Sequence, residues 1–285
     1  MLSYRHEFHA GNRADVFKHS VLFSFLNIFT QNKKTFTAFD LNAGKGIYNL
    51  LSDWSLQTGE AETGILYLLN LYENQKLPEP IPQDLKLYLD YCKKNYTTSK
   101  IYAGSPEIIR SFLNPKSELI LTELQSGEYS NLKQLYKGVK NIHIHKRDCY
   151  EAFKALTPPE QKRGFALFDP SYEVTSDYNN IEITAEQVLK KWNTCKFIIW
   201  YPIIKRRFTE TEKLKENLSL SAYSKNIDIF NIEINHKPVH HSESSESGYG
   251  LIGSGIIIIN PPWGLKEKIE QLADYYISLK KLPDL

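Results

Sequence analysis

Cysteine is scarce in this chain of 285 residues. The three cysteines, Cys92, Cys149 and Cys195, lie far apart, and no two of them form a Cys-x-x-Cys pair. This distribution argues against a structural zinc site and against a disulfide scaffold. It favours a reducing compartment, so we expect the protein to be cytoplasmic.

Long hydrophobic runs are also absent. No window approaches the roughly 18 consecutive apolar residues of a membrane-spanning helix. The N-terminal segment lacks the apolar run of about 7–15 residues found in signal peptides, and its Glu7 and Asp15 do not fit an acid-poor mitochondrial presequence. We therefore expect no membrane association and assign this segment to the working protein.

Net charge is small as well. The 35 lysines and arginines nearly balance the 33 aspartates and glutamates, which leaves a net charge of +2. Such a composition does not indicate a nucleic-acid-binding protein, so any basic surface must be local.

The chain does contain an alternation of short apolar runs and helical patterns, which predicts a doubly wound α/β sheet. Several of the apolar runs are nearly continuous, as in strands that helices cover on both faces. The predicted strands are 35–40, 118–123, 141–146, 164–169, 196–201, 227–234 and 255–260. The predicted helices are 14–31, 105–113, 127–137, 149–156, 181–193, 205–219 and 264–281.

Two segments interrupt this alternation. Residues 52–98 have leucine-rich helical patterns, no strand pattern and a proline-rich break, "KLPEPIPQDL". We predict that they form an inserted helical subdomain, and that residues 1–51 and 99–285 form the main domain. Residues 236–254 are polar and rich in glycine and serine, which predicts a flexible loop between the last two strands.

Carboxylates follow four successive predicted strands. Asp40 ends the first strand in "FDLNAGKG", and Glu123, Asp148 and Asp169 lie at or just beyond the ends of the next three. Ligands of open α/β sheets bind beyond the carboxyl ends of the strands. Each acid alone is explained equally well as a solvated strand end, and Asp148 as a helix N-cap. The ordered set of four favours a ligand site.

This layout resembles that of Rossmann-like S-adenosylmethionine-dependent methyltransferases. The segment "DPSY" is similar to the Asp-Pro-Pro-Tyr motif of enzymes that methylate exocyclic amino groups, adenine N6 above all. The opening "MLSYRHEFHAGNRADVFKH", with "DLNAGKGIY", "AGSP", "LTEL" and "INPPW", resembles the RlmJ family of 23S ribosomal RNA adenine-N6 methyltransferases, formerly described as proteins of external-DNA catabolism. The resemblance implies a seven-stranded class I methyltransferase sheet with a reversed last strand and a helical insertion after the first strand–helix unit.

The resemblance also implies a binding site for S-adenosyl-L-methionine. Glu123 would accept hydrogen bonds from the two ribose hydroxyls, because a carboxylate has two acceptor oxygens, and Asp148 would accept one from the adenine amino group. Gly44 and Gly46 would let the backbone approach the methionine part of the cofactor. The implied cofactor residues are Lys18, His19, Asn42, Gly44, Gly46, Ser105, Glu123, Asp148, Cys149 and Asp169.

The first predicted helix places Lys18 and His19 where the family binds the methionine part, and a cation there would meet the cofactor's carboxylate. Two residues depart from the family pattern. Asn42 stands where the family more often has a histidine, and Ser171 replaces the second proline of the motif. Full activity is therefore a point to test.

The catalytic residues implied by the motif are Asp169, Pro170 and Tyr172. The lone pair of adenine N6 is delocalised into the ring, so this nitrogen is a poor nucleophile. Hydrogen bonds to Asp169 and to the Pro170 carbonyl would localise and orient the lone pair, and the carboxylate would take the proton. Tyr172 would stack on the target base, which must leave its helix to reach the pocket.

The expected partner is 23S rRNA before full ribosome assembly, with adenine 2030 as the implied target. Tyr4 is expected to stack on a base, and Arg5, His6 and Arg13 to contact phosphate or base edges. Two further segments are candidates for the RNA surface: "KWNTCK" at 191–196 and "IKRRF" at 204–208.

Three alternatives remain open at this stage. The chain could be a DNA adenine methyltransferase, a protein glutamine methyltransferase, or a non-enzymatic nucleic-acid-binding protein in DNA uptake. The segment "NPPW" at 260–263 also fits the amino-methyltransferase motif, but it follows the last strand and not the fourth. His143 and His145 alternate on one predicted strand and do not indicate a metal site, so we predict no metal.

Overall fold

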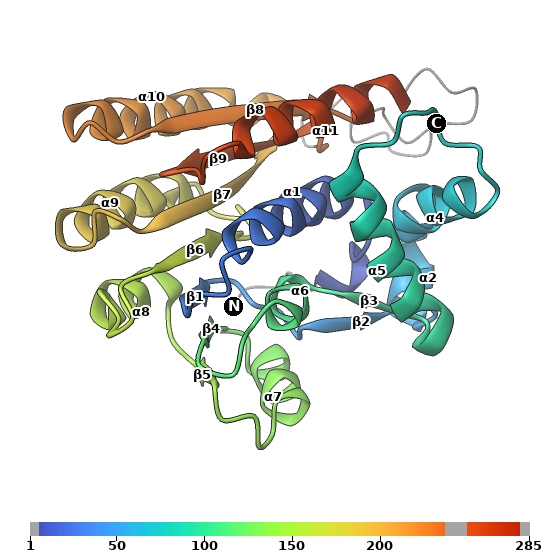
Figure 1. Cartoon of the computed structure of the whole chain (residues 1–285), viewed down its shortest axis with the longest axis horizontal. Helices are drawn as coiled ribbons and strands as arrows, with labels where there is room; N and C mark the ends of the chain where they lie inside the picture. The colour runs from blue at the N-terminus through green and yellow to red at the C-terminus, as the bar shows by residue number, and fades with distance from the viewer. Residues whose placement is uncertain (1–5, 237–249, 280–285) are drawn as a thin grey trace.

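Seven strands form one central sheet in the order β5-β4-β1-β6-β7-β9-β8. All seven coincide with predicted strands, which confirms the α/β fold. The computed structural model, shown in Figure 1, describes residues 6–236 and 250–279. The strands are β1 (Thr37–Asp40), β4 (Glu118–Thr122), β5 (Ile142–His145), β6 (Gly164–Phe168), β7 (Lys196–Ile203), β8 (Ile229–Asn235) and β9 (Gly253–Ile259).

One strand of this sheet is reversed. Strands β5, β4, β1, β6 and β7 pair parallel, whereas β9 pairs antiparallel with both β7 and β8. This is the arrangement of class I methyltransferases that the resemblance implies. Because β9 is reversed, its carboxyl end lies at the opposite edge of the sheet from the carboxyl ends of the five parallel strands.

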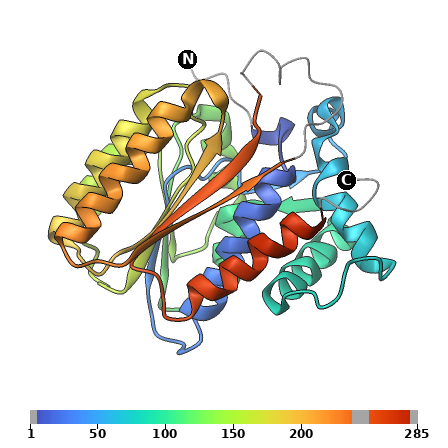
Figure 2. The same cartoon turned by 90° about the horizontal axis from the view of Figure 1, so that it is seen from above.

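Helices cover both faces of the sheet (Figures 1 and 2). Alternate strand residues enter different cores: Ala38 packs on the side of α1, and its neighbour Phe39 packs on the other side. The first side carries α1 (Arg13–Phe29), α6 (Ser105–Ser111), α7 (Ser126–Leu135) and α11 (Leu265–Leu279). The second side carries α8 (Cys149–Leu156), α9 (Ser176–Lys191) and α10 (Phe208–Ser224), the last preceded by the short turn η2 (Lys205–Arg207).

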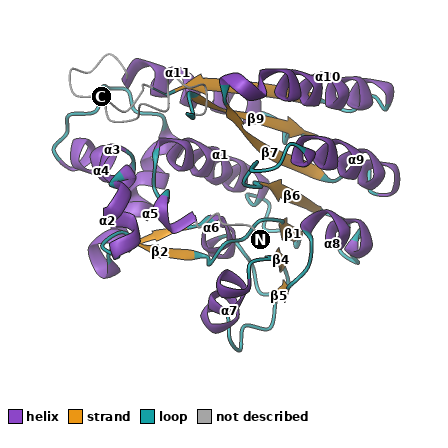
Figure 3. Cartoon of the chain, turned by 180° about the vertical axis from the view of Figure 1, so that it is seen from behind, coloured by secondary structure: helices purple, strands orange, loops and turns teal. Residues whose placement is uncertain are grey.

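Residues 52–98 are helical, as Figure 3 shows. Their buried leucines Leu85 and Leu89 share one core with Phe25 of α1. The division of the chain into a main domain and a separate subdomain stays a prediction. The helices are α2 (Asp53–Thr58), α3 (Glu60–Thr63), α4 (Ile65–Glu73) and α5 (Gln83–Ser99).

A short antiparallel ribbon flanks these helices. It pairs β2 (Ile47–Asn49) with β3 (Ile101–Ala103), outside the central sheet. Neither strand was predicted, because three residues are too few to show an alternating pattern.

Within 6–236 and 250–279, no helix combines the length and apolar character needed to cross a membrane. Tyr4, Arg5 and most of the predicted loop at 236–254 lie outside the described residues.

Candidate functional site

A cavity of about 1010 Å³ lies at the carboxyl ends of the parallel strands, between the sheet and the start of α1. This volume is at the upper end of the range of roughly 300–1,000 Å³ for small-molecule sites, so the cavity has room for more than one ligand group. The predicted site residues that line it are His6, Arg13, Lys18, His19, Asn42, Gly44, Ser105, Glu123, Asp148, Cys149, Asp169 and Pro170. Gly46 and Tyr172 are not among the described residues that line it.

Glu123 is held by backbone amides at the end of β4. Its Oε2 accepts a hydrogen bond from the Gly44 amide at 2.9 Å, and its Oε1 accepts one from the Gln125 amide at 2.7 Å. Gly44 has a φ of +58°, and a Cβ there would collide with the hydroxyl of Tyr48. Burial raises the pKa of Glu123. Since each carboxylate oxygen can accept more than one hydrogen bond, Glu123 keeps acceptor capacity toward the cavity.

Asn42 links three elements of the site. Its Oδ1 accepts a hydrogen bond from the Asp169 amide at 3.2 Å, and its Nδ2 lies 3.8 Å from the sulfur of Cys149.

Asp148 caps the N-terminus of α8, because its Oδ1 accepts from the Glu151 amide at 2.9 Å. The N-cap interpretation of Asp148 is thereby confirmed, and a role toward a cofactor stays a prediction.

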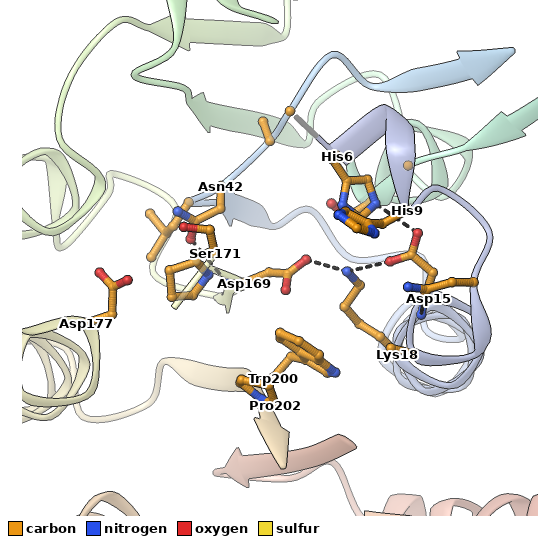
Figure 4. A pocket seen from close by; sticks show the side chains of 18 of the residues that line it. His6, His9, Asp15, Lys18, Asn42, Asp169, Ser171, Asp177, Trp200 and Pro202 are labelled. Carbon is orange, nitrogen blue, oxygen red and sulfur yellow. Dashed lines mark hydrogen bonds and ion pairs between the residues drawn. The ribbon is translucent and has the colours of Figure 1, made fainter. Parts of the chain in front are cut away.

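A row of paired side chains runs from the N-terminal segment to the end of β6 (Figure 4). The His6 Nε2 lies 2.8 Å from Oδ2 of Asp15, and the Lys18 ammonium lies 2.8 Å from Oδ1 of Asp15. The same ammonium donates to Oδ2 of Asp169 at 2.5 Å. The Lys18 charge is thus paired with two aspartates of the chain, and a contact between Lys18 and a cofactor carboxylate stays a prediction.

These contacts shift the pKa values of Asp15, Lys18 and Asp169. Burial raises the pKa of Asp169, and the neighbouring Lys18 ammonium opposes that rise. Burial would also raise the pKa of Asp15, but His6 and Lys18 hold it well below its ordinary value. Burial would lower the pKa of Lys18, yet the two carboxylates raise it above the ordinary value. Lys18 is thus a buried cation that favours the ionised form of Asp169.

His19 is a neutral residue of the cavity wall. It is buried, its Nδ1 lies 2.7 Å from the Tyr102 hydroxyl, and that hydroxyl lies 3.0 Å from the hydroxyl of Tyr88. Burial lowers the pKa of His19 to about 3. His19 therefore carries no positive charge for a cofactor's carboxylate near neutral pH.

The structure contradicts the predicted orientation of Tyr172. Its side chain is only 3 % exposed, its hydroxyl donates to the Trp200 carbonyl at 2.5 Å, and its ring centre lies 4.8 Å from that of Tyr178. The backbone at Tyr172 has a φ of +54°, and the side chain enters the core on the side of α9. In this conformation the ring fixes the end of β7 and cannot stack on a base in the cavity.

Trp200 lines the cavity instead, and sequence reasoning missed it. Figure 4 shows its ring beside Asp169 and Lys18. The Lys18 ammonium lies 5.4 Å from the ring centre, and the indole Nε1 is buried without a hydrogen-bond partner. The position of Trp200 near the carboxyl end of a strand could have indicated a site residue. Because Trp200 lies within the apolar run of β7, the sequence pattern is equally that of a core residue.

Asp40 is a buried acid behind the cavity wall. Its Oδ2 has no hydrogen-bond partner, and its Oδ1 accepts a long hydrogen bond of 3.4 Å from the Asn42 amide. Burial raises the pKa of Asp40 to about 7, against a hydrogen bond from Ser105 and together with the negative charge of Asp169. The folded protein therefore retains a proton that the unfolded chain releases near pH 4.

This proton predicts a pH-dependent effect of Asp40→Asn. The contribution of Asp40 to the free energy of unfolding falls as pH rises from about 4 to about 7, because this group binds its proton more tightly in the folded state. The variant has no such group. The free energy of unfolding of the variant minus that of the wild type should therefore increase by about 2 kcal/mol from pH 5 to pH 8. Urea unfolding at the two pH values measures the difference. An equal effect of the substitution at both pH values would contradict the prediction.

Two segments singled out in the sequence lie at the other edge of the sheet. Residues 191–196 lead into β7, and residues 260–263 follow the reversed strand β9. The Asn260 amide group donates to the carbonyls of Asn193 and Cys195, both at 2.8 Å, so this residue fastens the turn before β7. "NPPW" therefore plays no part in the cavity. By contrast, Ile204 of "IKRRF" lines the cavity. The described part of the chain contains no cluster of three or more metal-ligating side chains.

Comparison with known proteins agrees with this geometry. A family model described as "Ribosomal RNA large subunit methyltransferase D, RlmJ" matches residues 33–282. The ribosomal RNA large subunit methyltransferase J of Haemophilus influenzae is 34% identical over 278 residues, which cover 96% of this chain and 92% of that protein. The protein of the same name from Escherichia coli is 31% identical over 280 residues, which cover 98% and 94%.

A solved structure extends the likeness to three dimensions. The crystal structure of protein LPL1258 from Legionella pneumophila matches with a TM-score of 0.80 and 28% identity, covering 95% of this chain and 93% of that one. The chain thus belongs to the RlmJ family of ribosomal RNA large subunit methyltransferases.

Proposed function

We propose that this protein methylates the N6 amino group of a specific adenine in 23S rRNA, with S-adenosylmethionine as the methyl donor. The observation that carries the proposal is the position of Asp169 and Pro170 at the carboxyl end of β6, in the wall of a cavity that Glu123 and Gly44 also line. The relatives named ribosomal RNA large subunit methyltransferase J support rRNA as the substrate class.

The cavity fits the methyl donor. The donor has a ribose with two hydroxyls, and Glu123 offers a half-buried carboxylate already oriented by two backbone amides. Gly44 lines the cavity with its backbone alone, and its φ of +58° suits glycine. Glu123, Gly44, Asn42, Ser105 and the α8 cap at Asp148 would hold the donor, which supplies an electrophilic methyl group when bound. The chain's other residues prepare the amine that receives it.

Glu123→Ala tests the donor site. The substitution leaves the donor's hydroxyls without a charged acceptor and frees two backbone amides, so affinity for S-adenosylmethionine should fall at least about tenfold. Isothermal titration measures the loss. Glu118→Ala, which removes an exposed acid from the other end of β4, is the matched control and should bind as the wild type does. Affinity of Glu123→Ala equal to that of the control would remove Glu123 from the site.

Asp169 and Pro170 act on the adenine amine. The Asp169 carboxylate accepts a hydrogen bond from N6–H, the Pro170 carbonyl accepts the second, and together they orient the nitrogen lone pair. The carboxylate then takes the proton that the nitrogen loses. Lys18 keeps Asp169 ionised until the amine arrives, since its ammonium is 2.5 Å from Oδ2. Ser171 leaves these roles unchanged, because the motif's chemistry uses the carbonyl of Pro170.

Trp200 takes the stacking role that the sequence assigned to Tyr172. Its ring borders the cavity beside Asp169, whereas the ring of Tyr172 is buried. Base–aromatic stacking contributes about 1–3 kcal/mol. Trp200→Ala should therefore raise the KM for RNA roughly tenfold or more and leave the affinity for the methyl donor within a few-fold.

Tyr172→Phe is the control for Trp200→Ala, because it keeps the ring and removes only the hydroxyl that bonds to the Trp200 carbonyl. It should lower stability modestly with little change in KM. A KM for RNA that rises more in Tyr172→Phe than in Trp200→Ala would contradict the assignment.

A methylation assay on 23S rRNA tests the proposed function directly. The enzyme should methylate a protein-free transcript and fail on assembled large subunits, because the target base must leave its helix to enter the cavity and assembly restricts that movement. Mass spectrometry locates the modified adenine. The main alternative is a non-enzymatic protein of DNA uptake, which would bind nucleic acid but not S-adenosylmethionine. Isothermal titration with S-adenosylmethionine distinguishes this alternative from the methyltransferase.

A further inference from the structure

Positive charge gathers at the edge of the sheet where the strands begin, away from the cavity. Six segments at this edge connect a helix to the next strand of the sheet: 30–36, 112–117, 136–141, 157–163, 192–195 and 225–228. They contain eight lysines and arginines but two acids, in a chain whose net charge is only +2. The eight residues, here called the strand-start cations, are Lys33, Lys34, Lys116, Lys137, Lys140, Lys162, Arg163 and Lys225.

Seven of the strand-start cations belong to four adjacent strands. They precede β5, β4, β1 and β6, which are neighbours in the sheet. With about 4.8 Å between neighbouring strands, the four strand starts span roughly 15 Å. The blue turn that carries two of them, after α1, lies at the bottom of Figure 2. The charges therefore form one continuous stripe.

Hydrogen bonds hold the loops of the stripe to one another. The Asn114 side-chain amide donates to the Lys34 carbonyl at 3.3 Å, and the Arg163 guanidinium donates to the same carbonyl at 3.4 Å. The Asn141 amide group donates to the Ser117 carbonyl at 2.8 Å. The loops before β5, β4, β1 and β6 are thus joined pairwise, so the backbone under the cations is fixed.

Most of these charges face solvent, whereas the Arg163 guanidinium lies against the Phe29 ring and donates to the carbonyls of Phe29 and Lys34, and the Lys225 ammonium donates to the Ser221 carbonyl. None of the eight strand-start cations forms an ion pair with another described residue, and six of them are exposed. Unpaired cations on a fixed backbone match the phosphates of a nucleic acid, whose binding is driven by the release of counterions. A nucleic-acid backbone is an acidic partner of this kind, and the proposed function selects RNA.

We infer that the strand-start cations bind phosphates of the same RNA molecule whose target adenine enters the cavity, at a site distant from that adenine. The inference rests on the proposed function. The strands between the two edges have four to eight residues, which correspond to about 13–26 Å. A short stem-loop that fills the mouth of the cavity does not reach the stripe, whereas full-length 23S rRNA can pass around the molecule to it.

The test reverses three charges of the stripe, in Lys34→Glu/Lys116→Glu/Lys162→Glu. The control, Lys76→Glu/Lys94→Glu/Lys213→Glu, makes the same change in net charge at exposed lysines on other faces. RNA affinity is measured by filter binding without the methyl donor, for a full-length 23S transcript and for a stem-loop of about eight base pairs that contains the target. Thermal unfolding verifies that both variants are folded.

The stripe variant should bind the full-length transcript at least about tenfold more weakly than the control does, and both should bind the stem-loop alike. The slope of log K against log salt for the long RNA should be shallower by about 2–3, because roughly 0.9 is lost per phosphate contact. Equal losses in the stripe variant and the control would overturn the inference, and so would an equal loss on both RNAs. Wild-type protein that binds the transcript through the stripe but does not methylate it would refute the proposed function and leave only RNA binding by the strand-start cations.

Discussion

Asp169→Ala will lower the rate of methyl transfer to RNA at least about a hundredfold while affinity for S-adenosylmethionine stays within a few-fold. In the proposed mechanism the carboxylate contacts the amine and takes its proton, so its removal should destabilise the transition state and leave binding of the donor unchanged. In the proposed site the donor lies at the ends of β1 and β4, where the Gly44 amide donates to the Glu123 carboxylate without involving Asp169. Single-turnover kinetics with saturating donor and RNA measures the rate.

Asp177→Asn is the matched control for this experiment. Asp177 lines the same cavity, and its Oδ1 accepts a hydrogen bond from the Tyr150 hydroxyl at 2.9 Å. Its replacement should change the rate by only a few-fold, because it lies on α9 and outside the motif. Asn260→Ala should also leave the rate unchanged, since Asn260 lies at the far edge of the sheet. An Asp169→Ala enzyme with near-normal turnover would contradict the proposal that Asp169 accepts the proton of the amine.

The acids that frame the site could be predicted because the ends of the strands can be located in the sequence. Each acid of the set ends or follows a predicted strand, and parallel strands bring their carboxyl ends to one edge. The reversed strand also explains why "NPPW" misleads: its chemistry resembles the motif, but pairing of β9 antiparallel to β7 places it away from the cavity. Strand order, and not local composition, decides between the two motifs.

The orientations of the side chains within the site could not be predicted from the sequence. Tyr172 adopts a φ of +54°, which turns its ring into the core and leaves the cavity to Trp200. That conformation depends on packing against Tyr178, a contact between the motif and a helix that the sequence does not reveal. Lys18 likewise lies on α1, 151 residues before Asp169, and only the tertiary fold brings the two together.

Lys18→Met is expected to cost as much activity as the loss of Asp169, with a different pH profile. Without the ammonium, the buried Asp169 has no cation beside it, so its pKa rises further above the ordinary value. A smaller fraction of the enzyme then carries the ionised carboxylate at pH 7, and the rate should fall about a hundredfold. Activity should recover as the pH is raised, because the acidic limb of the rate profile moves upward with the pKa of Asp169.

Stability separates this role from a contact to the methyl donor. Removing a buried cation that bridges two carboxylates costs about 3–5 kcal/mol of unfolding free energy, and Lys18 bridges Asp15 and Asp169. Lys18→Arg keeps the charge and should restore most of the stability and the wild-type pH profile, with a rate limited by the altered geometry. If Lys18 served only the donor's carboxylate, Lys18→Met would instead raise the KM for S-adenosylmethionine and leave both the pH profile and the unfolding free energy unchanged. The row of paired side chains from His6 to Asp169 would then be a feature of packing, and the proton at the adenine amine would need another explanation.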